Sequence, residues 1–217
     1  MNTNNPSVQP GARALFIALA AMAAIVTLSN ILVQYPVQLT LGAVDLADLL
    51  TWGAFTYPVA FLVTDAVNRL FGPAMARRVV AGGFVVAVAL SIWLATPRIA
   101  IASGTAFLCA QLLDVAVFDR LRAGRWWRAP LVSSILGSAL DTVLFFALAF
   151  APAFAMLDFG AAEPGSLGFP APFLGLGPQV PLWTSLAAGD FIVKLLVGLA
   201  MLVPYGAIAH SRLAPST

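Results

Sequence analysis

Six long apolar runs limit the fold of this sequence more than any other feature. A helix needs about 20 mostly apolar residues to cross the hydrocarbon core of a bilayer, and each run approaches or exceeds that length. The runs cover residues 14–34, 51–71, 79–96, 98–118, 129–150 and 183–208. Only 9% of the residues are charged, whereas soluble domains carry roughly 25%. The sequence therefore predicts an all-α, polytopic integral membrane protein with six transmembrane helices.

The predicted organisation is a short tail followed by one domain. Residues 1–12 are polar and show no periodic pattern, so we expect a disordered cytoplasmic tail there. Residues 13–212 are expected to form a single six-helix transmembrane domain, because a chain of 217 residues usually makes one domain.

Arginine residues set the predicted orientation of the chain. One side of the predicted bundle carries Arg13, Arg69, Arg77, Arg78, Arg120, Arg122, Arg125, Arg128 and Arg212. The other side carries only Arg98, at the end of a helix. Cytoplasmic loops are enriched in Lys and Arg, so we predict a multi-pass protein of the inner (cytoplasmic) membrane with both termini in the cytoplasm. A net charge of +2 could suggest a nucleic-acid partner. Because the arginines cluster at the ends of the helices, we interpret them as a topology signal and expect the lipid bilayer, not nucleic acid, as the partner.

Polar side chains form a stripe along each of two predicted helices. The stripe in the fourth helix consists of Ser103, Phe107, Gln111 and Asp114, and the stripe in the fifth consists of Ser134, Ser138, Asp141 and Phe145. An acidic residue in a spanning helix costs about 2.5–3.5 kcal/mol on insertion scales and usually faces a bundle interior or a cavity. Both stripes are therefore expected to line an interior site.

Two acid–base pairs occur at a spacing of four residues. Asp190 and Lys194 stand in the order that favours pairing within a helix, and they are predicted to form a charge pair inside the bundle. Asp65 and Arg69 have the same spacing and can pair on one face of the second helix. Pro58 lies in that helix and is expected to bend it.

Two further polar residues have alternative interpretations that the sequence leaves open. Asn30 either makes an interhelical hydrogen bond or contacts a ligand. Arg98 either sits at headgroup level or turns inward as a planar hydrogen-bonding group for a ligand. Residues 151–182 form a long segment rich in Pro, Gly and Phe, which is expected on the outer side without secondary structure, dipping into the bilayer or lying over the mouth of the bundle.

Several of these segments also resemble a known family. The run T-W-G-A-F-T-Y-P-V-A-F-L-V-T-D-A-V-N-R-L-F-G-P-A-M-A-R-R at residues 51–78 is similar to the second-helix signature of the queuosine-precursor transporters, a vitamin-uptake-transporter-like family. Residues 98–122 and 126–146 resemble its fourth and fifth helices, and D-F-I-V-K-L-L at residues 190–196 gives a shorter match. The resemblance implies uptake of 7-cyano-7-deazaguanine and 7-aminomethyl-7-deazaguanine. It also implies a six-helix fold similar to the substrate-binding subunits of energy-coupling-factor transporters.

The polar residues suit such a ligand. A 7-deazaguanine presents a ring N–H and an exocyclic amine beside a carbonyl, so a carboxylate can accept two hydrogen bonds while Gln, Asn, Arg or Lys serves the carbonyl. The candidate substrate-binding residues are Asn30, Phe55, Asp65, Arg98, Ser103, Gln111, Asp114, Asp141, Asp190 and Lys194. Phe55, Tyr57, Phe107 and Phe145 are candidates to stack on the base. We expect a central site with Gln111 and either Asp114 or Asp141 on the base, and Arg98 as an outer gate or structural anchor.

Two other function classes compete with transport, an intramembrane enzyme and a substrate-binding subunit. The sequence contains no P-loop, so the chain is not expected to hydrolyse ATP itself. We also expect it not to be an enzyme and to need no cofactor or metal; its single cysteine, Cys109, excludes a thiolate metal site within one chain. An intramembrane aspartyl enzyme is the weaker alternative, because Gly189–Asp190 lacks the preceding Gly of the G-x-G-D pattern. A binding subunit that needs an energising partner is the stronger one, since the basic loops could dock such a partner. A homodimer is a further option that the sequence leaves open.

Overall fold

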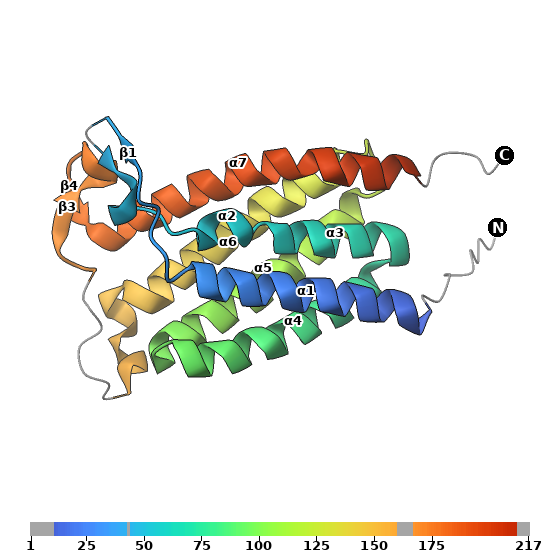
Figure 1. Ribbon diagram of the computed structural model, residues 1–217, viewed down its shortest axis with the longest axis horizontal. Coiled ribbons are helices and arrows are strands. Elements are labelled where there is room, and N and C mark those ends of the chain that lie inside the picture. The colour runs from blue at the N-terminus through green and yellow to red at the C-terminus, as the bar shows by residue number, and fades with distance from the viewer. Residues whose placement is uncertain (1–10, 43, 160–166, 212–217) are drawn as a thin grey trace.

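The structure is a computed structural model that describes residues 11–42, 44–159 and 167–211, and these form a bundle of long helices (Figure 1). The helices are α1 (Ala12–Leu32), α2 (Gly53–Thr56), α3 (Val59–Phe71), α4 (Pro73–Leu94), α5 (Pro97–Leu121), α6 (Arg128–Phe150) and α7 (Leu182–Ser211). Five of the described helices, α1, α4, α5, α6 and α7, are long and apolar enough to cross a membrane. Residues 1–10 of the predicted tail lie outside the described residues.

The second predicted span is divided into two helices. Helix α2 ends at Thr56 and α3 begins at Val59, so the break falls at Pro58 as predicted. Proline lacks a backbone N–H and cannot continue the hydrogen bonds of the preceding turn. Figure 1 shows α2 and α3 following one another along the bundle. Neither piece is long enough to cross a membrane alone, so the count of six spans stays a prediction.

The sequence predicts a tight turn at residues 72–78, between the second and third spans, and this prediction is wrong because most of the segment is helical. Gly72 alone separates α3 from α4, and it has a positive φ of 86° that favours glycine. Pro73 then occupies the first position of α4, where a missing N–H costs nothing. Arg77 and Arg78 therefore lie inside a helix and not in a loop.

Close contact between α1 and α4 depends on two adjacent glycines, Gly82 and Gly83. A Cβ atom at Gly82 would lie 2.4 Å from Leu19 Cδ2, and one at Gly83 would lie 2.6 Å from Met22 Cγ. Both distances are shorter than real Cβ contacts allow. Small residues at such positions let helix backbones approach closely in membranes, so this glycine pair allows α1 and α4 to pack together.

Large apolar side chains cover the outside of the long helices. Trp93 is 90% exposed, Val203 is 77% exposed and Phe16 is 72% exposed. Such a surface would be unstable in water, whereas lipid tails are as apolar as these side chains. The exposed faces and the five long helices show a multi-pass membrane protein.

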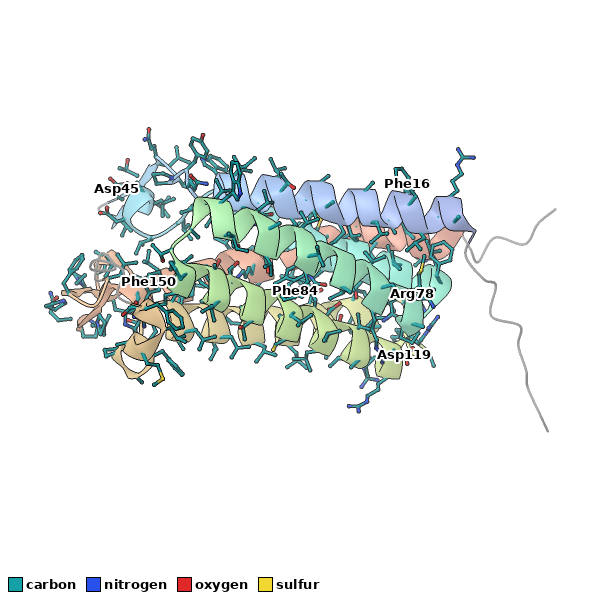
Figure 2. The ribbon with its side chains drawn as sticks, turned by 90° about the horizontal axis from the view of Figure 1, so that it is seen from below. Phe16, Asp45, Arg78, Phe84, Asp119 and Phe150 are labelled. Carbon is teal, nitrogen blue, oxygen red and sulfur yellow. The ribbon has the colours of Figure 1, made fainter. Side chains whose placement is uncertain are left out.

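The two ends of the bundle differ in structure. At one end lie the start of α1 and the end of α7 (Figure 1), together with Arg78 and Asp119 (Figure 2). We call this the arginine-rich end. The opposite end, the hairpin end, carries strands β1, β3 and β4 (Figure 1) and the side chains of Asp45 and Phe150 (Figure 2).

Two short antiparallel hairpins form the hairpin end. Strand β1 (Thr40–Leu41) pairs with β2 (Val44–Asp45), and β3 (Pro170–Pro172) pairs with β4 (Gln179–Pro181). Three short 3-10 helices complete this end, namely η1 (Leu46–Asp48), η2 (Pro152–Asp158) and η3 (Phe173–Gly175). The prediction that residues 151–182 lack secondary structure is therefore wrong for the part that is described.

Candidate functional site

A cavity of about 520 Å³ lies inside the bundle, in the half toward the hairpin end. This volume falls within the range of about 300–1,000 Å³ typical of ligand sites. Its polar lining includes Ser29 and Asn30 of α1, Gln34 just after α1, Tyr57 beside α2, Ser91 of α4, Ser103 of α5, Asp141 of α6, and Asp190 and Lys194 of α7. Leu167, from the segment that carries β3 and β4, also lines it. The described part of that segment thus lies over the mouth of the bundle, which is one of the two predicted positions; the other was a dip into the bilayer.

A buried triad of one lysine and two aspartates forms one wall of the cavity. Lys194 Nζ lies 2.7 Å from Asp141 Oδ2 and 2.5 Å from Asp190 Oδ2. The Thr142 hydroxyl donates to Asp190 Oδ2 at 2.8 Å, and Lys194 Nζ donates to the same hydroxyl at 3.3 Å. With every group ionised, the triad carries one unit of negative charge in excess.

The predicted charge pair of Asp190 and Lys194 is confirmed by this geometry, but it is incomplete. Asp141 joins from another helix, and spacing within one helix could not reveal it. Thr142 was also missed; its signal was only its position next to Asp141 in a spanning helix.

Two of the four aromatic candidates line the cavity, namely Tyr57 and Phe145. The Tyr57 ring lies 5.5 Å from Lys194 Nζ, within the range of a cation–π contact. Phe107 is buried behind it and packs edge-on against the Tyr57 ring at 6.2 Å. Phe55 is not among the described residues that line the cavity, and its ring packs against Trp52 at 5.6 Å.

Two neighbouring polar residues of α1, Ser29 and Asn30, make different contacts. Ser29 donates to the Thr56 hydroxyl at 3.1 Å and so links α1 to α2. Asn30 lines the cavity and donates to the Val26 carbonyl of its own helix at 2.9 Å. The interhelical hydrogen bond considered for Asn30 is therefore made by its neighbour, and the amide of Asn30 faces the cavity.

Arg98 is a buried clamp and does not line the cavity. Its Nε donates to the Leu148 carbonyl at 2.8 Å, and its Nη2 donates to the Ala151 carbonyl at 2.7 Å. Its Nη1 bonds both carboxylate oxygens of Asp158, at 3.1 and 3.2 Å. All three nitrogens are thus engaged in joining the start of α5 to the end of α6 and to η2. Of the two predicted roles, outer gate and structural anchor, the structure favours the anchor.

A second polar cluster lies nearer the arginine-rich end and is separate from the cavity. Thr64 donates to Gln111 Oε1 at 2.6 Å, and Ser133 donates to Asp65 Oδ1 at 3.3 Å. Asp114 is fully buried beside them. None of Asp65, Gln111 and Asp114 is among the described residues that line the cavity. The expected central site combined Gln111 with either Asp114 or Asp141 on the base. Of these three residues only Asp141 lines the cavity, because the candidates fall into two clusters.

The pairing of Asp65 with Arg69 is also not observed. Arg69 Nη1 instead donates to the Arg122 carbonyl at 2.8 Å, and Arg122 Nη2 donates to the Arg69 carbonyl at 3.4 Å. This exchange joins the ends of α3 and α5. Among the described residues, the Asp65 carboxylate is hydrogen-bonded by Ser133 and forms no ion pair.

The fold and the cavity together define a multi-pass helical membrane protein that encloses a site of the right size for a small molecule. The family described as "Putative vitamin uptake transporter" matches residues 51–96 and 90–208. The chain belongs to this family, and the family predicted from the sequence is confirmed.

The curated relatives are named for transport. The chain is 33% identical over 211 residues to the "Queuosine precursor transporter" of Escherichia coli (strain K12), covering 87% of this chain and 83% of the relative. It is 33% identical over 214 residues to the "Probable queuosine precursor transporter" of Haemophilus influenzae, covering 86% and 82%. A Bacillus subtilis relative with the same name is 26% identical over 194 residues, covering 76% and 73%. No solved structure matches the chain, so the likeness to energy-coupling-factor subunits stays a prediction.

Proposed function

We propose that this chain imports the 7-deazaguanine precursors of queuosine, 7-cyano-7-deazaguanine and 7-aminomethyl-7-deazaguanine, across the inner membrane. The names of relatives that cover more than four fifths of this chain support the substrate class and favour transport over catalysis. The observation that carries the proposal is the triad of Asp141, Lys194 and Asp190 on the wall of the cavity.

The chemistry of the triad matches the ligand. A carboxylate accepts hydrogen bonds only, and a 7-deazaguanine offers a ring N–H beside an exocyclic amine. Asp190 is the more accessible acid, with 16% of its side chain exposed against 6% for Asp141. We assign the base contact to Asp190, and a stacking contact to Tyr57 or Phe145. The excess negative charge also suits the aminomethyl group, which is cationic near neutral pH.

The base contact predicts a loss of affinity in Asp190→Asn. Hydrogen bonds to a charged group are worth about 1.5–3 kcal/mol, so we expect binding of 7-aminomethyl-7-deazaguanine to weaken about 10- to 100-fold. Isothermal titration of the purified protein measures this directly. Asp119→Asn is the matched control, because Asp119 forms only a surface pair with Arg122. Equal affinity of the Asp190→Asn variant and the parent would remove Asp190 from the site.

We also propose that the arginine-rich end faces the cytoplasm, which places both termini there. The support is the excess of basic side chains at that end and their scarcity at the hairpin end. Cysteine labelling in intact cells checks this, with Cys109, which is exposed, first replaced by Ala. An impermeant reagent should label Gln38→Cys and leave Ala123→Cys unlabelled. The reverse pattern would invert the topology.

A binding subunit that needs an energising partner is the second candidate. Exposed Arg120 and Arg125 at the arginine-rich end give such a partner a surface to contact. Reconstitution of the chain alone in liposomes separates the two functions, because a solitary transporter moves substrate without help.

A further inference from the structure

We propose that Asp65 and Asp114 form a proton-binding pair that carries the coupling proton during import. This inference rests on the proposed transport function and concerns the cluster that the cavity does not use. The ligand is a proton, held between two carboxyl groups that face each other from α3 and α5.

Burial and the absence of a cation are the first observations. Asp65 is 2% exposed and Asp114 is 0% exposed, and their carboxyl groups lie within hydrogen-bonding reach of each other. Among the described residues neither forms an ion pair. Two adjacent carboxylates repel each other, so such a pair holds a proton on one of its members. Asp141 and Asp190 do not need such a proton, because the Lys194 ammonium group neutralises part of their charge. Asp65 and Asp114 have no such cation among the described residues.

The hydrogen bonds around the pair favour a proton on the Asp65 carboxyl group. Ser133 donates its one hydroxyl proton to Asp65 or to the Pro130 carbonyl. Neither carboxylate oxygen of Asp114 accepts a hydrogen bond of standard geometry among the described residues, although Ser133 and Asp65 both lie close to this carboxylate. A buried acceptor without a donor is costly. A protonated Asp65 is the missing donor, since its O–H can reach Asp114 and satisfy one of those oxygens.

A second, independent feature of the same site is a small cavity that borders Asp65. Its volume of about 10 Å³ is close to the lower limit for holding one water molecule. Tyr205 lines it, and the Tyr205 hydroxyl is buried without a hydrogen-bond partner among the described residues. The space is too small for an organic substrate and lies at the lower limit for a single water molecule. The ligand of this site is therefore a proton and not a second deazaguanine.

Other groups face the pair without neutralising it. Arg69 of α3 lies near Tyr205 of α7 and donates to the Arg122 carbonyl. From α5, Gln111 accepts from Thr64 through its oxygen, and its buried Nε2 has no described partner. No described residue among these supplies a cation in contact with either carboxylate.

Helix α6 connects the pair to the substrate cavity. Ser133 bonds Asp65, Ser134 and Ser138 line the small cavity, and Asp141 belongs to the triad. The rise from Ser134 to Asp141 is about 10 Å at roughly 1.5 Å per residue. A movement of α6 that accompanies ligand binding thus acts on both sites. Binding of one proton changes the charge of the pair from −2 to −1, and its release toward the arginine-rich end completes one transfer.

The test uses purified protein in liposomes and two assays. Exchange of labelled for unlabelled 7-aminomethyl-7-deazaguanine without a gradient reports transport itself. Accumulation driven by an acidic exterior, with the membrane potential clamped by valinomycin and potassium, reports proton coupling. We expect the parent and the control Asp119→Asn to do both. We expect Asp65→Asn and Asp114→Asn to retain exchange and to lose gradient-driven accumulation at least 10-fold.

Each other outcome has a distinct meaning. Absence of exchange in the parent would overturn the proposed function. If the parent exchanges substrate but does not accumulate it in response to a proton gradient, only the proton pair is overturned. Accumulation driven by a sodium gradient in place of a proton gradient would also overturn it. Unchanged coupling in both variants would also overturn it. If neither variant folds, the infrared band of a protonated carboxyl group in the parent at neutral pH decides, and its absence refutes the pair.

Discussion

Lys194→Met is expected to abolish ligand binding and to lower the free energy of unfolding by about 3–5 kcal/mol, the usual effect of removing one partner of a buried ion pair. Methionine is also unbranched and is one atom shorter than lysine, so the substitution keeps most of the volume while it removes the charge and its hydrogen-bond donors. Asp141 and Asp190 would then face each other uncompensated inside the bundle. Thermal denaturation in detergent measures the change in stability, and titration with 7-aminomethyl-7-deazaguanine measures the loss of binding.

The triad also predicts the order of the combined variants. Adding Asp190→Asn to Lys194→Met removes one uncompensated acid, and adding Asp141→Asn removes the second. Stability should therefore rise from the single variant to the double and again to the triple, because neutral polar groups are cheaper to bury than unpaired charges. Arg125→Met serves as the control for loss of a cation at an exposed position. Equal instability of the single and triple variants would show that the three residues act separately.

Much of the fold follows from the sequence because bilayer crossing is a local property. Hydropathy and length predict the ends of the five long helices to within a few residues, except for the start of α4. Pro58 predicts the break between α2 and α3. The start of α4 was placed wrongly because a cluster of arginines was interpreted as a loop. Arginine side chains extend along a helix toward the interface, so charge alone does not end a helix.

The site was harder to predict because it depends on contacts between helices. Helical spacing identified Asp190 and Lys194, which lie one turn apart on α7. The same spacing suggested Asp65 with Arg69, yet each of these contacts a different helix. Spacing shows which residues share a face, but not which neighbouring helix meets that face. Asp141 and Asp114 are equivalent in the sequence pattern but lie in two different clusters. Asp141 contacts Lys194, whereas Asp114 contacts no lysine among the described residues.

Arg98→Ala is expected to lower the free energy of unfolding by about 3–5 kcal/mol, since it removes a buried charge that several groups depend on. Two carbonyls and the Asp158 carboxylate would lose their donors at once. Affinity for 7-aminomethyl-7-deazaguanine should stay within about threefold of the parent, because Arg98 is not among the described residues that line the cavity and sites without shared partners act nearly independently.

Arg98→Lys separates the charge of this clamp from its shape. Lysine keeps a cation near Asp158 but has no rigid planar group to reach both carbonyls, so we expect a loss of stability between those of the parent and Arg98→Ala. Arg125→Ala, at an exposed position, should melt like the parent. Thermal denaturation and ligand titration of the four proteins distinguish the two roles considered for Arg98. If Arg98→Ala melts normally but loses affinity at least 10-fold, Arg98 contacts the ligand as a gate and the clamp is not its function.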